Sequence, residues 1–437
     1  MKVLKFGGTS VGSADRMKEV AKLINDGEKK IVVLSAMSGT TNTLVEISDY
    51  LYKKNPEGAN EIINKLEDAY RKHINQLYST DEYKKKGQEI IKSHFDYIRS
   101  FTKDLFTLFE EKVVLAQGEL ISTAMINNYL LECGVKSVLL PALDFMRTDK
   151  NSEPDPTYIR EKLQMLLDQH PDADIYITQG FICRNAYGEI DNLQRGGSDY
   201  TASLIGAAIQ ASEIQIWTDI DGLHNNDPRI VDKTAPVRQL HFEEAAELAY
   251  FGAKILHPTC IQPAKYSNIP VRLLNTMEPS APGTLISNET EKSKIKAVAA
   301  KDNITAIKIK SSRMLLAHGF LRKVFEIFES YQTSIDMICT SEVGVSMSID
   351  NTKHLGEILN DLKKYGTVTV DEGMCIVCVV GDLDWENVGF EAKALDAMRE
   401  IPVRMISFGG SNYNISFLIR KEDKQRALQS LSNMLFN

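Results

Sequence analysis

Lys2-Val-Leu-Lys-Phe6 runs directly into Gly7-Gly8-Thr9-Ser10, and this stretch decides the fold. The first five residues are mostly apolar and predict a short strand, and residues 31–35 predict a second one. A strand, a glycine loop, a helix and a second strand in this order indicate a parallel α/β sheet. The helix is predicted because four apolar residues recur at the spacing of one helix face: Met17, Val20, Ala21 and Ile24.

The α/β pattern continues after one interruption. Residues 56–112 are charged, rich in tyrosine and poor in glycine, which predicts a helical excursion from the sheet with its charges facing solvent. The sheet is then expected to resume on the far side of this excursion. Further strands are predicted at 135–140, 175–178 and 214–218, and further helices at 118–132, 157–169 and 199–211.

The C-terminal part of the chain carries a different pattern, and that pattern occurs twice. Met337-Ile338 precedes one alternating strand and Met405-Ile406 precedes another, and each copy has a helix, a strand, a glycine-containing turn and a strand. A turn-forming cluster at 278–283 ends the part before it. We therefore expect a first domain over residues 1–285, a linker over 286–302, and small α+β modules over 303–374 and 375–437.

The composition is that of an acidic globular protein. The 437 residues include 51 Lys and Arg against 59 Asp and Glu, a formal net charge of −8. Binders of nucleic acid or anionic membranes need clustered positive charge, so neither partner is expected. No apolar run reaches the roughly 18–20 residues of a membrane span, and the N-terminus meets glycine before a signal peptide could form. A cytoplasmic location with reduced cysteines is the expectation.

Two of the six cysteines, Cys375 and Cys378, have the C-x-x-C spacing of some metal and redox sites. They lie in a β-type run, where residues three apart point to opposite faces of the strand. No second Cys or His pair offers metal-ligand spacing. The sequence therefore predicts buried strand thiols and no protein-bound metal site.

The glycine loop at residues 7–10 suits an anion. Glycines let backbone N–H groups approach closely, the helix that follows adds the partial positive charge of its N-terminus, and Lys5 can reach the same place. A phosphate group fits this combination, although a tight strand-to-helix turn would use the same glycines. The loop is not a Walker motif, because Ser13 stands where that motif requires lysine after Gly12.

Four further loops carry polar side chains where strands are predicted to end or helices to begin. The loop at 35–42 combines glycine with hydroxyl side chains, and the loop at 194–199 combines glycine with charged side chains. The loop at 217–229 is rich in aspartate, and the loop at 251–258 contains a lysine. Each has a structural explanation too: Asp199 is a good helix N-cap, the other aspartates can shape turns as well as hold Mg²⁺ or a ribose, and the lysine can face solvent. Together, positioned cations at strand ends favour phosphoryl transfer, which needs them against spreading negative charge.

These motifs resemble those of the aspartate kinase (aspartokinase) family, in family order. The motifs are Lys5-Phe-Gly-Gly-Thr-Ser10, Gly118-Glu-Leu-Ile-Ser-Thr123, Arg195-Gly-Gly-Ser-Asp199, Trp217-Thr-Asp219, Asp227-Pro-Arg229 and Gly252-Ala-Lys254. The tail resembles the family's paired ACT modules, so the resemblance covers nearly the whole chain. It implies an α/β amino-acid-kinase fold, a three-layer sandwich with a central, mainly parallel sheet, followed by two ACT-like α+β modules.

The resemblance implies an enzyme that phosphorylates the β-carboxylate of L-aspartate with ATP, giving 4-phospho-L-aspartate on the way to lysine, threonine and methionine. Mg²⁺ would arrive with ATP rather than occupy a site of its own. The implied catalytic residues are Lys5, which would stabilise the transferred phosphoryl group, and Asp199, which would orient Lys5. No protein general base is needed, because the β-carboxylate of aspartate is already ionised at neutral pH.

The same match implies binding residues. Glu119 would hold the α-ammonium of aspartate and Arg195 would clamp a carboxylate through two parallel hydrogen bonds, with Thr41, Gly196 and Ser198 beside them. His224 departs from the tyrosine of the family pattern, but its ring could still stack near the nucleotide. The implied nucleotide-binding residues are Gly7, Gly8, Thr9, Ser10, Thr218, Asp219, His224, Arg229 and Lys254.

The tail motifs are similar to the monofunctional, lysine-sensitive branch of the family. These motifs are Gly319-Phe-Leu321, Val324-Phe-Glu-Ile327, Ser334-Ile-Asp336 and Thr340-Ser-Glu342. They imply feedback inhibition by an amino acid, with L-lysine favoured over threonine, although ordinary strand-end capping would use the same residues. A homodimer joined through the modules, or a dimer of dimers, is expected. The candidate effector contacts are Met314, Ser334, Asp336, Thr340, Ser341 and Glu342.

Two alternatives to this function stay open on the residues alone. Another amino-acid kinase, such as glutamate 5-kinase or a carbamate-type enzyme, shares the loops but not the Lys5–Ser10 motif together with a doubled ACT tail. A non-catalytic amino-acid sensor would have no need of Lys5, Arg195 and Asp199 together.

Overall fold

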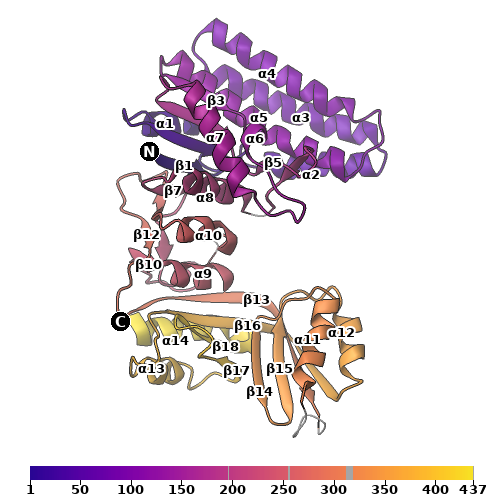
Figure 1. Cartoon of the computed structure of the whole chain (residues 1–437), viewed down its shortest axis with the longest axis vertical. Coiled ribbons are helices and arrows are strands. Elements are labelled where there is room, and N and C mark those ends of the chain that lie inside the picture. The colour runs from indigo at the N-terminus through magenta and orange to yellow at the C-terminus, as the bar shows by residue number, and fades with distance from the viewer. Residues whose placement is uncertain (195, 254–255, 312–317, 437) are drawn as a thin grey trace. The chain divides into compact units, whose positions relative to one another are not determined.

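The computed structural model describes residues 1–194, 196–253, 256–311 and 318–436. The chain folds as two compact units (Figure 1). Unit 1 comprises residues 1–223 and 256–288, and unit 2 comprises residues 224–255 and 289–437. Residues 224–255 thus belong to the second unit, which differs from the predicted single domain over residues 1–285. None of the described helices combines the length and apolarity needed to cross a membrane.

Unit 1 is built on a mainly parallel sheet, as the sequence predicts. Its strands follow the order β12-β11-β7-β1-β2-β4-β3, and each neighbouring pair is parallel except the antiparallel β11 and β12. The predicted strands are all present, with limits that differ by no more than two residues. The strands are β1 (Lys2–Phe6), β2 (Lys30–Leu34), β3 (Ser137–Leu140), β4 (Ile175–Gln179), β7 (Ile214–Thr218), β11 (Val271–Asn275) and β12 (Thr284–Ser287).

The sheet of unit 1 lies between two layers of helices, and the side chains of β1 point alternately towards each layer. Because successive side chains point to opposite faces, Leu4 and Phe6 join a core with helices α1, α2 and α5, whereas Lys5 faces the side of β1 on which α8 packs. Helices on both faces make the three-layer sandwich that the sequence predicts. The helices are α1 (Ala14–Ile24), α2 (Thr40–Tyr52), α5 (Leu108–Glu132), α6 (Ala142–Phe145), α7 (Pro156–Gln169), α8 (Gly197–Ile209) and α10 (Pro258–Tyr266), with a small hairpin of β5 (Ile182–Arg184) and β6 (Ile190–Asn192).

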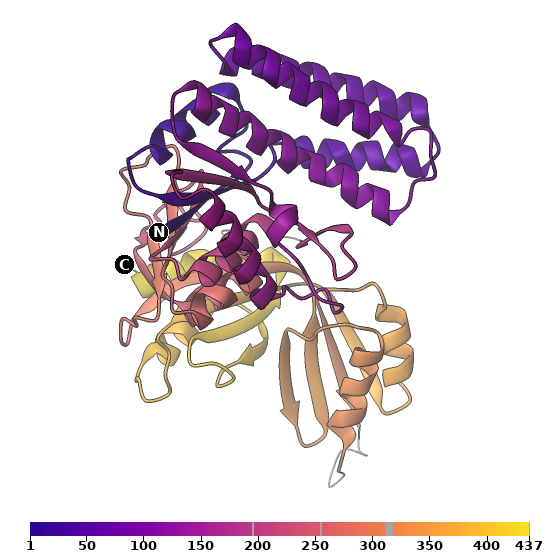
Figure 2. The same ribbon diagram turned by 45° about the horizontal axis from the view of Figure 1, so that its top comes forward.

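The predicted helical excursion is confirmed as α3 (Pro56–Leu77) and α4 (Asp81–Ser100), which pack on each other and on α2 and α5 (Figure 2). Most of its charged side chains face solvent. Glu67 is the exception, because it is buried and pairs with Arg71 and Arg99. Helix α5 begins ten residues before the predicted limit of 118, since a capping box at Thr107 starts it.

Unit 2 contains a second sheet with the strand order β14-β15-β13-β16-β18-β17. Each predicted copy of helix, strand, glycine-containing turn and strand is present, as α11-β14-β15 and as α13-β17-β18. The elements are β13 (Ile295–Lys310), β14 (Met337–Ser341), β15 (Gly344–Ile349), β16 (Thr367–Gly381), β17 (Val403–Ser407), β18 (Asn414–Arg420), α9 (Phe242–Tyr250), α11 (Phe320–Ser330), α12 (Leu355–Leu362), α13 (Phe390–Ala397) and α14 (Lys424–Phe436), with the short strands β8 (Leu223–His224), β9 (Pro236–Val237) and β10 (Gln239–His241).

Strands β13 and β16 are long and serve both modules. Residues 295–301 of β13 pair with 376–381 of β16, and residues 306–310 pair with 367–371. The predicted linker over 286–302 is therefore wrong from Ile295 onwards, and the predicted module boundary after residue 374 falls inside β16. The charged residues at 289–294 lead to the prediction of a linker, but the short apolar run that follows them, Ala297-Val-Ala-Ala300, forms part of a central strand.

The predicted burial of the C-x-x-C thiols on a strand is confirmed. Cys375 and Cys378 are free thiols on β16, and both are fully buried. Burial raises the pKa of each thiol. Both behave as small apolar core residues rather than as reactive groups.

Candidate active site

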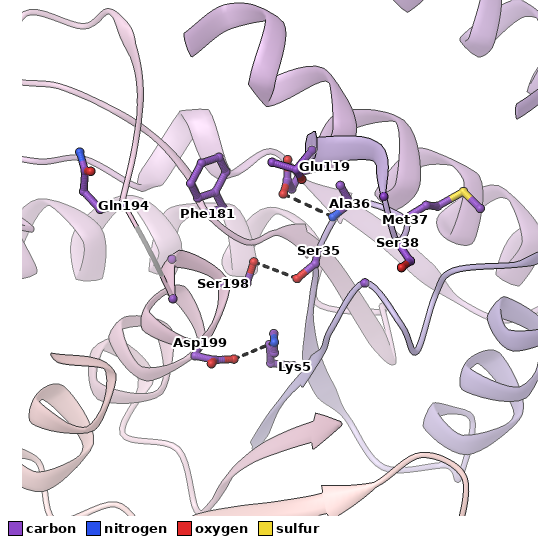
Figure 3. Close-up of a pocket in the computed structure, with 15 residues that line it drawn as sticks. Lys5, Ser35, Ala36, Met37, Ser38, Glu119, Phe181, Gln194, Ser198 and Asp199 are labelled. Carbon is purple, nitrogen blue, oxygen red and sulfur yellow. Dashed lines mark hydrogen bonds and ion pairs between the residues drawn. The ribbon is translucent and has the colours of Figure 1, made fainter. Parts of the chain in front are cut away.

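A cavity of about 370 Å³ opens at the carboxyl ends of β1 and β2 in unit 1 (Figure 3). Strand β1 lies between β2 and β7, where the strand order of the sheet reverses direction. Open α/β sheets bind ligands at such a point. The lining residues are Lys5, Gly8, Ser35, Ala36, Met37, Ser38, Gly39, Thr41, Glu119, Phe181, Gln194, Gly196, Gly197, Ser198 and Asp199.

Lys5 and Asp199 form an ion pair in this cavity. The Lys5 Nζ lies 2.7 Å from Asp199 Oδ1, and the two side chains are only 11% and 14% exposed (Figure 3). Lys5 comes from the central strand β1 and Asp199 from the first turn of α8. The N-cap of α8 is Gly196, so Asp199 is not the capping residue, and its carboxylate instead holds the lysine ammonium towards the cavity.

Two serines join the loop after β2 to the start of α8. The Ser35 hydroxyl donates to Ser198 Oγ over 2.9 Å. Gly180 makes this approach possible, because a Cβ there would lie 2.6 Å from Ser198 Oγ. Sequence reasoning did not single out Ser35, Phe181 or Gln194 as site residues, although Ser35 and Gln194 lie in loops that it marked and Phe181 follows a predicted strand.

Glu119 is the third ionisable group of the cavity, after Lys5 and Asp199. It projects from α5, is 3% exposed, and its Oε1 accepts the Ala36 N–H over 3.3 Å. Its Oε2 is buried without a hydrogen-bond partner among the described residues. Burial raises the pKa of this carboxyl to about 8. An ammonium group entering the cavity would supply both the missing hydrogen bond and the opposite charge.

The glycine loop after β1 is fastened to the loop after β2. Gly8 O accepts the Ser38 N–H over 3.1 Å, and a Cβ at Gly8 would lie 2.9 Å from Ala36 O. Gly8 lines the cavity, whereas Gly7, Thr9 and Ser10 do not. Ser10 is buried, and its hydroxyl lies 3.2 Å from the Thr276 hydroxyl at the end of β11.

Comparison with known proteins identifies the family. Residues 1–275 match the model of the amino acid kinase family, and residues 377–435 match an ACT domain. The lysine-sensitive aspartokinase 3 of Escherichia coli is 32% identical over 447 residues, which covers 99% of this chain and 99% of that protein. The chain belongs to the aspartokinase family.

Two crystal structures of the E. coli aspartokinase III resemble the whole chain. The complex with aspartate and ADP has a TM-score of 0.87 at 32% identity, and the complex with lysine and aspartate has a TM-score of 0.80 at 33% identity. Each of the two matches covers 100% of this chain and 100% of the E. coli chain. The fold and the family that the sequence predicts are thereby confirmed.

The remaining nucleotide-binding candidates that the structure describes are not among the residues that line the cavity. Thr218 ends β7, which pairs with β1, and Asp219 follows it and is exposed. In unit 2, His224 Nδ1 lies 2.8 Å from the Thr234 hydroxyl. Arg229 donates from Nε and Nη2 to the two oxygens of Asp227 over 2.9 and 2.7 Å, which lowers the pKa of that carboxyl. The predicted residues Arg195 and Lys254 lie outside the described residues.

The effector candidates that the structure describes lie at the two ends of β14. Ser334 and Asp336 precede the strand, Thr340 and Ser341 end it, and Glu342 follows it; the last three are exposed. Met314 lies outside the described residues.

Asp336 is the buried member of this group, with a side chain that is 0% exposed. Its Oδ1 accepts hydrogen bonds from Lys301 Nζ over 2.9 Å and from the Tyr250 hydroxyl over 2.7 Å. Burial raises the pKa of the carboxyl, against the effect of these two donors. Lys301 also pairs with Asp350 over 2.8 Å.

The buried carboxyl of Glu119 predicts a particular dependence of stability on pH. Below its ordinary pKa of 4.5 the folded and unfolded chains both hold the proton; between 4.5 and about 8 only the folded chain does, so stability falls as pH rises. Glu119→Gln should remove this loss. The gain in unfolding free energy over the parent, measured in urea without ligand, should grow from pH 5 to pH 8 by up to about 1.4 kcal/mol per pH unit.

The matched control for this measurement is Glu89→Gln, at an exposed position on α4. Its difference from the parent should be the same at both pH values. A Glu119→Gln difference that is equally independent of pH would contradict the assignment of a protonated, buried carboxyl.

Proposed function

We propose that this chain transfers the γ-phosphoryl group of ATP to the β-carboxylate of L-aspartate and so forms 4-phospho-L-aspartate. The proposal rests on one observation: the same cavity contains a group that suits an anion and a group that suits a cation. The Lys5–Asp199 pair offers a cation, and Glu119 offers a buried acceptor oxygen, Oε2, with no hydrogen-bond partner among the described residues. Aspartate and a phosphoryl group together meet both. The E. coli relative that was crystallised with aspartate and ADP supports the same assignment.

Glu119 receives the α-ammonium of aspartate. An ammonium at hydrogen-bond distance favours the carboxylate over the protonated carboxyl, so binding lowers the pKa of Glu119 and releases its proton near neutral pH. Thr41, Gly196 and Ser198 line the same cavity and are proposed as further substrate contacts. The carboxylate clamp predicted at Arg195 stays a prediction.

Lys5 stabilises the negative charge that spreads over the phosphoryl oxygens during transfer. Its Nζ is held by Asp199 before the substrates arrive, so little reorganisation is needed at the moment of reaction. The nucleophile is the substrate β-carboxylate, which is ionised at neutral pH and needs no protein base. The residues of the chain thus position the substrates and stabilise negative charge, and phosphoryl transfer depends mainly on these two effects.

The nucleotide is proposed to lie along the loops that follow β1 and β7, from Gly7–Ser10 to Thr218 and Asp219. ATP enters with Mg²⁺ bound to its phosphates. No group of three or more His, Cys, Asp or Glu within the described ranges is placed to hold a metal ion of its own. The nucleotide contacts of His224, Arg229 and Lys254 stay predictions.

The modules of unit 2 are proposed to bind L-lysine as a feedback inhibitor. A buried carboxylate that already accepts a lysine ammonium, as Asp336 does from Lys301, has the chemistry to hold the ammonium of an effector. The E. coli relative that was crystallised with lysine and aspartate supports this effector. Inhibition would act by differential binding of lysine to active and inactive forms. Dimerisation through the modules stays a prediction.

The substrate assignment is tested by a coupled assay of ADP release with L-aspartate and with L-glutamate. Aspartate should support turnover that depends on ATP and Mg²⁺, because the distance between Glu119 and the Lys5–Asp199 pair has to suit one length of amino acid. Glutamate should be turned over at least about 100-fold less efficiently. Turnover with glutamate alone would refute the assignment, and absence of turnover with either would favour a sensor.

Lys5→Ala tests the catalytic cation. The substitution should lower kcat by roughly 100- to 1000-fold, since it removes a preorganised charge from the transition state. Lys2→Ala is the matched control, because Lys2 lies on the same strand and pairs with an exposed Glu28. Its kcat should equal that of the parent. Retained turnover in Lys5→Ala would remove Lys5 from the mechanism.

Calorimetric titration with lysine, threonine and methionine in turn tests the effector. Lysine should bind, and Asp336→Asn should weaken its binding by about tenfold or more, because one charged partner is lost. Asp361→Asn, which removes a carboxylate that Lys364 and Tyr331 contact on α12, is the control and should leave lysine binding unchanged. Binding of threonine or methionine but not lysine would overturn the choice of effector.

A further inference from the structure

One buried hydrogen bond joins the helical excursion to the loop that borders the candidate active site. The hydroxyls of Thr40 and Tyr70 lie 2.7 Å apart. Thr40 is the first residue of α2, and Tyr70 lies well inside α3. The two residues are 3% and 2% exposed, so neither hydroxyl can turn to water instead. Breaking the bond would leave a buried donor or acceptor without a partner, which is costly.

The Tyr70 side chain is held rigidly from the excursion side. Its ring centroid lies 5.8 Å from that of Phe95 on α4 and 6.5 Å from that of His73 on α3. Burial raises the pKa of the Tyr70 hydroxyl, so it keeps its proton and stays a hydrogen-bonding group at all physiological pH values. Tyr70 is therefore a fixed point to which the loop can be attached.

The loop at residues 36–41 has few anchors of its own at this end. Gly39, the N-cap of α2, has a φ of +83° and provides no capping side chain. The Thr40 N–H donates to Met37 O over 3.0 Å, and within the described part of the chain the Thr40 hydroxyl has Tyr70 as its hydrogen-bond partner. The bond to Tyr70 is therefore the contact that ties this turn of the loop to the helical excursion.

Residues on both sides of Thr40 in the loop take part in the cavity. The next residue, Thr41, lines the cavity, and Ala36 at the other end of the loop donates its N–H to Glu119. The Thr40 methyl group also lies 3.3 Å from the point where Gly118 would carry a Cβ. Thr40 thus packs between α3 and the turn of α5 that presents Glu119.

We propose that Tyr70 is a positioning residue for the amino-acid substrate, acting through Thr40. The hydrogen bond holds the loop 36–41 against Glu119, so the excursion of α3 and α4 sets the affinity of the cavity for aspartate. Tyr70 itself touches no substrate. The inference rests on the proposed function, and it gives the excursion a role in the reaction beyond burying apolar surface.

The central experiment compares Tyr70→Phe with Tyr78→Phe in steady-state kinetics. Tyr78 is a matched control, because it too is 2% exposed and belongs to the excursion, and its hydroxyl donates over 2.7 Å to Met125 O, away from the loop. Tyr70→Phe should raise KM for aspartate by about three- to tenfold, while KM for ATP stays within about twofold. Tyr78→Phe should lower thermal stability to a similar extent without changing either KM.

The partner side of the bond provides a second, independent pair of variants. Thr40→Val removes the hydroxyl and keeps the shape, whereas Thr40→Ser keeps the hydroxyl. Thr40→Val should raise KM for aspartate like Tyr70→Phe, and Thr40→Ser should stay near the parent. The double variant Tyr70→Phe/Thr40→Val should be no worse than either single variant, because both remove the same bond.

Several outcomes would overturn the inference. These are an unchanged KM for aspartate in both Tyr70→Phe and Thr40→Val, an equal rise in Tyr78→Phe, and additive effects in the double variant. If Tyr70→Phe does not fold, the two Thr40 variants decide the question alone. A parent protein without activity on aspartate would refute the proposed function, whereas an active parent with unaffected variants would refute only this inference.

Discussion

The ion pair between Lys5 and Asp199 is the interaction around which the catalytic unit is organised. A lysine on a central strand, largely removed from water, requires a nearby carboxylate to stay charged at little cost. That carboxylate has to come from another element, so α8 must begin beside β1 and its first turn must face the cavity. Gly180 lets Ser198, the neighbour of Asp199, approach the sheet closely enough. The loops around the cavity are therefore arranged so that Asp199, in the first turn of α8, lies beside Lys5 on β1.

Glu119 shows the complementary arrangement, a buried carboxyl of which one oxygen is unpaired among the described residues. One oxygen accepts the Ala36 N–H and the other has no hydrogen bond in the described chain, so the group is neutral until a cation arrives. A cavity that holds one ion pair and one neutral carboxyl with an unpaired oxygen favours a ligand that carries a cationic group. An amino acid supplies the ammonium. The bond between Tyr70 and Thr40 joins the excursion helices to the loop whose Ala36 N–H donates to Glu119.

Much of the fold could be predicted because the local signals agree with the tertiary structure. Alternation in β1 and the apolar face of α1 are local patterns, and both elements formed where expected. The domain limits were less predictable. Residues 295–301 follow a charged stretch and fall within the predicted linker, but they pair with β16, and residues 224–255 belong to the second unit. A strand that completes a sheet far along the chain leaves a weak signal in its own residues.

The sequence by itself determined the family, the order of the motifs and the kinds of charge that the site offers, because those depend on residue type and spacing. It also placed Lys5, Glu119 and Asp199 among the candidates. Only the tertiary structure decided their state: the Lys5–Asp199 pairing, the raised pKa of Glu119, and the bonds from Thr40 to Tyr70 and from Asp336 to Lys301. The physical reason is that burial and hydrogen bonding depend on partners remote in sequence, and no local pattern records which partner arrives.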